Sequence, residues 1–123
     1  MLKNLALLLA GLITGITIMV AGRWPQAEVV HRSEQPATVT YADDSAHHLG
    51  LIRRDTLFGD PSHLVVVGRD PGFGHGHWVD LHTSLIEPGE EVAGTEWTAD
   101  GVRLRLTSGH ELYVPARHFL GGR

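Results

Sequence analysis

The histidines in the middle of the chain are the side chains best suited to chemistry. Nine of the 123 residues are histidine, and one short segment brings together His75, His77, Asp80 and His82. On an extended strand, side chains two positions apart point to the same face, so His75 and His77 could bind one metal ion together. Imidazole with a carboxylate suits Zn²⁺ or Cu²⁺, and three such ligands would leave a coordination position open for water. These four residues are the candidate metal site.

Strand geometry places a condition on this metal site. Strict alternation puts His82 on the face opposite His77 and on the same face as Asp80. A bulge at the neighbouring glycines would be needed to bring the four side chains together. A metal-dependent hydrolase would also need a base beside the bound water. The simpler interpretation is that the histidines face solvent in a glycine-rich hairpin.

Other patterns that could support catalysis are incomplete. The glycine-dense stretch 72–76 superficially resembles a nucleotide-binding loop, but it lacks a following helix and a Lys-Ser/Thr pair. Ser62, Ser84 and Ser108 lie close to histidines in the sequence, yet none of them sits in a nucleophile-elbow motif. We therefore expect a binding or accessory module rather than an enzyme.

Composition narrows the classes of partner. The chain contains no cysteine, which excludes disulfides, thiolate catalysis and cysteine-based zinc sites. Its formal net charge is −4 with histidine neutral, so it has no strongly basic surface with which to hold phosphates. We expect no nucleic-acid partner, and no cofactor apart from the Zn²⁺ or Cu²⁺ considered above.

An apolar stretch near the N-terminus predicts a membrane anchor. Residues 5–22 read LALLLAGLITGITIMVAG and carry no charge. A membrane-spanning helix needs about 20 apolar residues, with a range of about 17 to 25, so this stretch is just long enough. Lys3 precedes it, Arg23 and Trp24 follow it as interface anchors, and Pro25 would end the helix. We assign residues 1–22 to a transmembrane anchor.

A cleaved signal peptide is the alternative interpretation of the same segment. Signal peptides have apolar regions of about 7 to 15 residues before a small-residue cleavage site. Val20-Ala21-Gly22 matches such a site only approximately. Positive charges flank the segment on both sides and give no firm orientation. Because both interpretations export the following residues, we expect the rest of the chain outside the cytoplasm, held by a single membrane pass or secreted after cleavage.

The remainder of the chain divides into a linker and a β-rich domain. Residues 23–46 mix Pro, Gln, Glu, Ser and Asp, and we interpret them as a linker that could contribute one edge strand. Over residues 47–123, short apolar runs alternate with turn-forming clusters. We expect strands near 49–54, 64–68, 78–85, 95–98, 102–106 and 111–114, and one helical turn over 116–120.

The clearest strand pattern lies in the C-terminal third. Over residues 102–106, valine and leucine alternate with Arg103 and Arg105, and a turn then leads to the alternating stretch 111–114. We expect the arginines to pair across the hairpin with Glu111 or Tyr113 on an exposed face; a patch that binds anions or lipid head groups is the alternative. The predicted fold class is mainly β, with an N-terminal transmembrane helix followed by a small antiparallel β-barrel or sandwich.

Two stretches resemble a known group of proteins. They are residues 67–81, which read VGRDPGFGHGHWVDL, and residues 109–123, which read GHELYVPARHFLGGR. Both resemble small single-pass membrane proteins of unknown function from high-GC actinobacteria. The resemblance implies an anchored extracytoplasmic β domain, and it transfers no activity and no residue role.

These features predict a membrane-anchored extracytoplasmic binding or accessory module of the cell envelope. Its partners would be the membrane, through residues 5–22, and a protein of the envelope. The alternative is a histidine-based protein that binds divalent metal, or a metal-dependent hydrolase.

Overall fold

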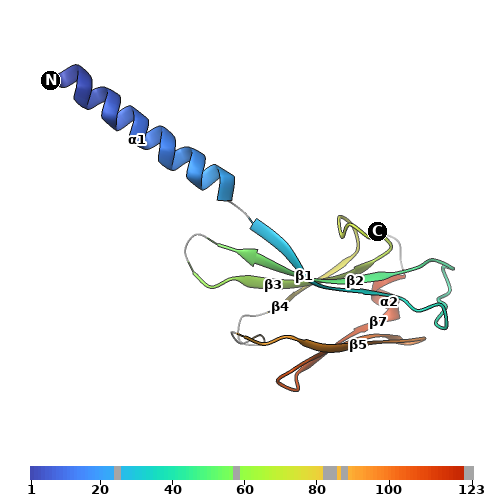
Figure 1. Cartoon of the computed structure of the whole chain (residues 1–123). Coiled ribbons are helices and arrows are strands. Elements are labelled where there is room, and N and C mark those ends of the chain that lie inside the picture. Colours follow the sequence, from blue (N-terminus) through green and yellow to red (C-terminus); the bar gives the residue numbers. More distant parts are fainter. Residues whose placement is uncertain (24–25, 57–58, 82–85, 87–88, 121–123) are drawn as a thin grey trace.

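The N-terminal segment forms one long helix that stands apart from the strands. The computed structural model describes residues 1–23, 26–56, 59–81, 86 and 89–120. Helix α1, Leu2–Arg23, projects away from the β structure (Figure 1). Its apolar stretch, Leu2–Ala21, has 20 residues and is 0% buried within the protein. At about 1.5 Å per residue such a stretch is about 30 Å long, which matches the hydrocarbon core of a bilayer.

Two threonines in α1 satisfy their hydroxyl groups within the helix. Thr14 and Thr17 donate hydrogen bonds to the carbonyl oxygens of Ala10 and Ile13, each at 2.8 Å. A hydroxyl bonded in this way needs no water, so it is compatible with a hydrocarbon environment.

Seven strands follow α1 in the described part of the chain and form two antiparallel sheets. The first sheet has the order β1-β2-β3-β4, and the second has the order β5-β6-β7. The strands are β1 (Gln26–Glu34), β2 (His48–Asp55), β3 (Ser62–Gly68), β4 (His77–Leu81), β5 (Val92–Thr98), β6 (Gly101–Leu106) and β7 (Glu111–Pro115). The short helix α2 (Ala116–Phe119) follows β7 directly and confirms the predicted helical turn.

The two sheets face each other and enclose the main core. Alternate residues of each strand point inward, as the pleat of a β-strand requires. The central core side chains, each at most 4% exposed, are Leu49, Leu51, Val65, Val67, Val102, Leu104 and Val114. The predicted mainly β fold class is therefore confirmed. Because the described strands belong to two separate sheets, the architecture is a sandwich rather than a barrel.

Aromatic side chains close one end of the sandwich, which we call the closed end. The ring centroid of Phe119 lies 5.3 Å from that of Tyr41, 5.1 Å from that of His47 and 6.4 Å from that of Trp97. His47 is 0% exposed. It immediately precedes β2, whose first residue pairs with Glu34 at the end of β1 farthest from α1.

Polar partners surround the buried His47. The Oε1 atom of Gln35 accepts hydrogen bonds from the backbone N–H of His47 at 3.0 Å and lies 2.8 Å from its Nδ1. On the other side of the ring, Nε2 lies 3.0 Å from Oδ2 of Asp43. Burial lowers the pKa of His47, although the charge of Asp43 opposes this effect.

The segment interpreted as a linker contains the edge strand that the sequence analysis allowed. Residues 23–46, interpreted above as a linker with one edge strand, contribute β1, which pairs with β2 from Gln26 to Glu34. They also contribute Tyr41, which is 6% exposed and donates a hydrogen bond from its hydroxyl to the carbonyl oxygen of Thr98 at 2.8 Å. The described β structure therefore includes β1 and Tyr41, and long-range contacts that local composition does not reveal hold this segment.

The glycine-dense stretch covers a second, smaller core on the outer face of the first sheet. The carboxylate of Asp70 accepts hydrogen bonds from the backbone N–H groups of Gly72 and Gly74, each at 2.9 Å. This turn seats Phe73 over Gly50, where an added Cβ would lie only 2.7 Å from the Phe73 ring. The guanidinium of Arg32 lies 4.8 Å from the centroid of the same ring. The loop therefore covers this smaller core, and the N–H groups of Gly72 and Gly74 are already hydrogen-bonded to the carboxylate of Asp70.

Candidate functional site

The structure separates the predicted metal ligands that it describes. His77 and Asp80 both lie on β4, where His77, with Val79, is half-buried on the inner side, and Asp80 is exposed on the outer side. The pairing of β3 with β4 runs without a bulge, so nothing realigns these two side chains. His75 is exposed and precedes the strand. His82 lies outside the described residues.

His77 instead meets a histidine that the sequence analysis did not single out. Its ring stacks on that of His118, with centroids 5.0 Å apart and planes inclined by 21°. Burial lowers the pKa of His77, and the neighbouring His118 lowers it further. Within the described ranges, no group of three or more His, Cys, Asp or Glu side chains could hold a metal ion. The metal site, which includes His82, stays a prediction.

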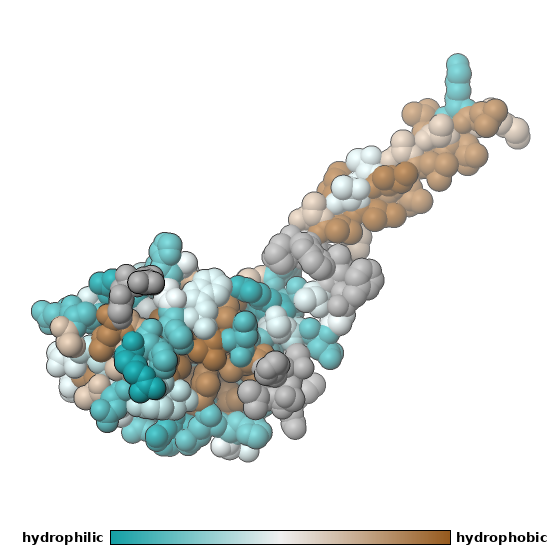
Figure 2. Space-filling model, turned by 180° about the vertical axis from the view of Figure 1, so that it is seen from behind, coloured by the Kyte–Doolittle hydropathy of each residue, from teal (hydrophilic) through white to brown (hydrophobic). Residues whose placement is uncertain are grey.

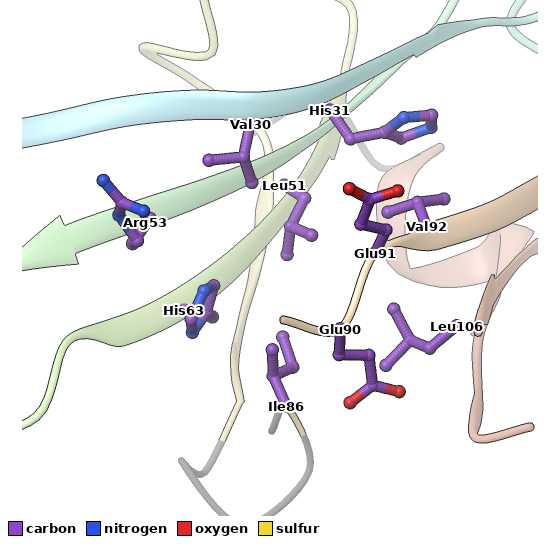
Figure 3. A pocket seen from close by; sticks show the side chains of 10 residues that line it. All are labelled: Val30, His31, Leu51, Arg53, His63, Ile86, Glu90, Glu91, Val92 and Leu106. Carbon is purple, nitrogen blue, oxygen red and sulfur yellow. The ribbon is translucent and has the colours of Figure 1, made fainter. Parts of the chain in front are cut away.

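A pocket opens between the two sheets at the end opposite the closed end, and we call it the inter-sheet pocket. Its volume is ≈ 430 Å³, within the range of about 300 to 1,000 Å³ typical of small-molecule sites. Figure 3 shows side chains of the first sheet facing those of the second sheet and of the segment before β5. The lining residues are Val30, His31, Leu51, Arg53, His63, Ile86, Glu90, Glu91, Val92 and Leu106.

A bulge in β1 brings two consecutive side chains to the pocket. The pairing of β1 with β2 shifts between Val29 and His31, where one extra residue, Val30, is inserted. Without the bulge, neighbours on a strand would face opposite sides of the sheet. Val30 and His31 therefore both line the inter-sheet pocket, whereas Val29 does not.

Both pocket histidines are half-buried and favour the neutral state. The Nε2 atom of His31 lies 3.0 Å from Oγ1 of Thr95, and burial lowers the pKa of this imidazole. Burial also lowers the pKa of His63, and the charge of Arg53 lowers it further. Because a free histidine has a pKa of about 6.5, both rings are mainly neutral at pH 7. The buried Nδ1 of His63 has no hydrogen-bond partner among the described residues.

Negative charge predominates around the pocket. Nη2 of Arg53 lies 3.2 Å from Oε2 of Glu28, and its Nε lies 3.3 Å from Oδ1 of Asp55, so two carboxylates already balance this cation. On the opposite wall, Oε1 of Glu90 accepts hydrogen bonds from the hydroxyl and the backbone N–H of Ser108. Glu91 adds a second carboxylate to that wall. The arrangement combines an aliphatic interior with hydrogen-bonding imidazoles and an acidic margin, which suits binding of an amphiphilic molecule.

Comparison with known proteins identifies no relative. No protein-family model, no curated protein and no solved structure matches the chain. The resemblance of residues 67–81 and 109–123 to single-pass proteins of actinobacteria therefore stays a prediction.

Sequence reasoning missed the inter-sheet pocket entirely. Its residues come from β1, β2, β3, β5, β6 and the segment before β5, and they are adjacent only after the sheets have packed. The one local signal is the valine pair followed by histidine at residues 29–31, which breaks strict alternation where the bulge occurs. His118 gave no signal, because it lies far from His77 in the sequence and meets it only through α2.

Proposed function

We propose that the protein is a membrane-anchored, extracytoplasmic binding module of the cell envelope and that the inter-sheet pocket is its ligand site. The observation that carries the proposal is the exposure of α1. Its 20-residue apolar stretch is 0% buried against the β domain. Figure 2 displays the contrast on one face: the helix surface is largely hydrophobic, while hydrophilic residues surround a smaller hydrophobic area on the β domain. Hydrocarbon is the environment that satisfies such a helix.

Helix length supports a retained anchor over a cleaved signal peptide. Signal peptides have apolar regions of about 7 to 15 residues. The uncharged stretch of α1, residues 5–22, is longer at 18 residues, and the helix continues through the Val20-Ala21-Gly22 cleavage candidate to Arg23. Because β1 begins only three residues after the end of α1, a domain anchored in this way would lie close to the bilayer surface. A protein of the envelope could then meet the module there.

Membrane fractionation of the full chain tests the anchor. Expressed in a bacterium with a C-terminal epitope tag, the protein should stay in the membrane pellet after alkaline carbonate extraction. Its intact mass in detergent should be that of the full sequence. A variant with Leu9→Arg and Ile13→Arg should lose the pellet association, because each charge at a helix centre costs about 2.5 to 3.5 kcal/mol of insertion free energy. A soluble product whose mass shows loss of the first 20 or so residues would contradict the anchor.

A further inference from the structure

We propose that the inter-sheet pocket binds a membrane lipid. One hydrocarbon chain of the lipid would enter between the sheets, and the preferred head group would carry an ammonium and no net negative charge. The inference rests on the proposed anchoring of α1, because the anchor is what brings the pocket to a lipid surface.

Chain connectivity places this end of the sandwich beside the bilayer. Only residues 24 and 25 separate the end of α1 at Arg23 from the start of β1 at Gln26. Three residue steps span at most about 11 Å. Gln26, the first residue of β1, pairs with Asp55, the last residue of β2, so this end of the first sheet lies close to the end of the anchor. The pocket residues Arg53 and His63 pair with each other near the same end of the sheet.

The distance along β1 from the end of the anchor to the pocket is similar to the length of a lipid chain. Val30 lies four residues beyond Gln26 on β1, which corresponds to about 14 Å at about 3.4 Å per residue. One leaflet contributes half of a hydrocarbon core of about 30 Å, so a lipid chain is about 15 Å long. A chain that enters at the membrane-proximal edge can therefore reach Val30.

The side chains of the pocket are arranged for an apolar chain inside and a polar group outside. Both walls provide aliphatic contacts, which come from Val30, Leu51, Ile86, Val92 and Leu106. Two of these side chains, Leu51 and Leu106, are buried in the sandwich. The charged members of the lining are Arg53, Glu90 and Glu91, and Figure 3 shows Arg53 on the first sheet and the two glutamates on the segment before β5.

Charge selects the class of head group. Glu28 and Asp55 already neutralise Arg53, at 3.2 and 3.3 Å. Glu91 on the other wall is exposed and adds a further carboxylate, so negative charge exceeds positive charge at the pocket margin. An ammonium is attracted to such a margin, whereas an anionic head group is repelled.

Two neighbouring valines provide a matched pair of test positions. Val29 and Val30 are exposed to similar extents, 38% and 44%, and both lie on the edge strand β1. Only Val30 lines the pocket, since Val29 pairs with Ile52 on the outer face of the sheet. An aspartate at position 30 introduces a charge into the proposed chain path, and an aspartate at position 29 does not.

Photo-crosslinking of the full chain in nanodiscs tests the inference. The nanodiscs consist of phosphatidylcholine with a minor fraction of phosphatidylethanolamine that carries a diazirine near the end of one chain. After irradiation, mass spectrometry maps adducts on the helix and on the β domain. We expect adducts on α1 and on peptides that contain Val30, Ile86 or Leu106. Val30→Asp should lower the ratio of β-domain to α1 adducts at least fivefold, and Val29→Asp should leave it unchanged.

The remaining outcomes separate this inference from the anchoring proposal. Adducts on α1 without adducts on the β domain would overturn lipid binding and leave the anchor intact, whereas absence of adducts on α1 would overturn the anchor. A phosphatidylglycerol probe should give at least a threefold lower ratio than the phosphatidylethanolamine probe; equal ratios would overturn the head-group preference. If Val30→Asp melts without a cooperative transition, Val30→Ser replaces it and should also lower the ratio, and an unchanged ratio would overturn the inference.

Discussion

The two ends of the β-sandwich differ in how deeply they bury their histidines. At the closed end, His47 is 0% exposed, and Tyr41, Trp97 and Phe119 fill the space around it. At the other end, His31 and His63 are half-buried beside a pocket of ≈ 430 Å³. The same two sheets form both ends, so the sheets themselves do not decide which end is filled.

The difference arises from segments outside the central strands. Tyr41 from the connection before β2 and Phe119 from α2 carry aromatic rings into the closed end. The segment before β5 brings Ile86, Glu90 and Glu91 to the other end, and these side chains leave space between the walls. Packed aromatic volume stabilises a fold, whereas unfilled space with polar margins is available for a ligand.

The largest expected effect is at the closed end. Phe119→Ala should reduce the free energy of unfolding by about 3 to 5 kcal/mol, because the side chain is buried and its removal leaves a cavity among Tyr41, His47 and Trp97. Denaturant unfolding of the full chain in detergent, followed by tryptophan fluorescence, measures it. Val30→Ala in the pocket should change the same quantity by only about 0.5 kcal/mol. Equal losses at the two positions would contradict the contrast between the ends.

A second, smaller effect is a loss of stability in acid. Burial holds the pKa values of His31, His47 and His63 below the ordinary histidine value. The unfolded chain therefore binds more protons than the folded chain at acidic pH, so the free energy of unfolding falls as pH drops below about 6.5 and is constant above about pH 7. Thermal melts between about pH 5 and about pH 7.5 measure the effect.

Single substitutions assign this acid effect to the two ends. His47→Gln and His63→Gln should each flatten the pH dependence, because burial lowers the pKa of both imidazoles. A steeper pH dependence in the His47→Gln variant than in the wild-type chain would contradict the assignment.

The smallest effect on the free energy of unfolding is expected on the outer face of the second sheet, away from both ends. Arg103 and Arg105 pair there with Glu111 at 3.5 and 3.2 Å, which confirms the partner expected across the hairpin, and also with Glu96 at 3.8 and 3.3 Å, which the sequence analysis did not name. All four side chains are about half exposed, so Glu96→Gln should cost only about 0.2 to 1 kcal/mol. The difference should vanish in about 1 M salt, where the Debye length is about 3 Å. A loss of unfolding free energy comparable to that of Phe119→Ala would contradict this prediction, because the face would then stabilise the fold as much as the closed end does.

Local patterns predicted the strands whose side chains alternate. Residues 102–106 lie in β6 with Val102, Leu104 and Leu106 buried, as their alternation indicates, and the same reasoning places Asp80 on the outer side of β4. Local patterns did not predict positions whose burial or neighbours depend on tertiary contacts. Tyr41 is core although its neighbours have the composition of a linker, and His31 and His63 share a pocket although the sequence separates them widely.

Topology is the property on which the account depends most, and the absence of cysteine makes it directly measurable. Single cysteines at Asn4, near the start of α1, and at exposed Ala99, in the turn between β5 and β6, report the two sides of the membrane. In intact spheroplasts, a membrane-impermeant maleimide should label the Ala99→Cys variant and leave Asn4→Cys unlabelled until the membrane is permeabilised. Labelling of Asn4→Cys but not Ala99→Cys in intact spheroplasts would place the β domain in the cytoplasm and contradict the account.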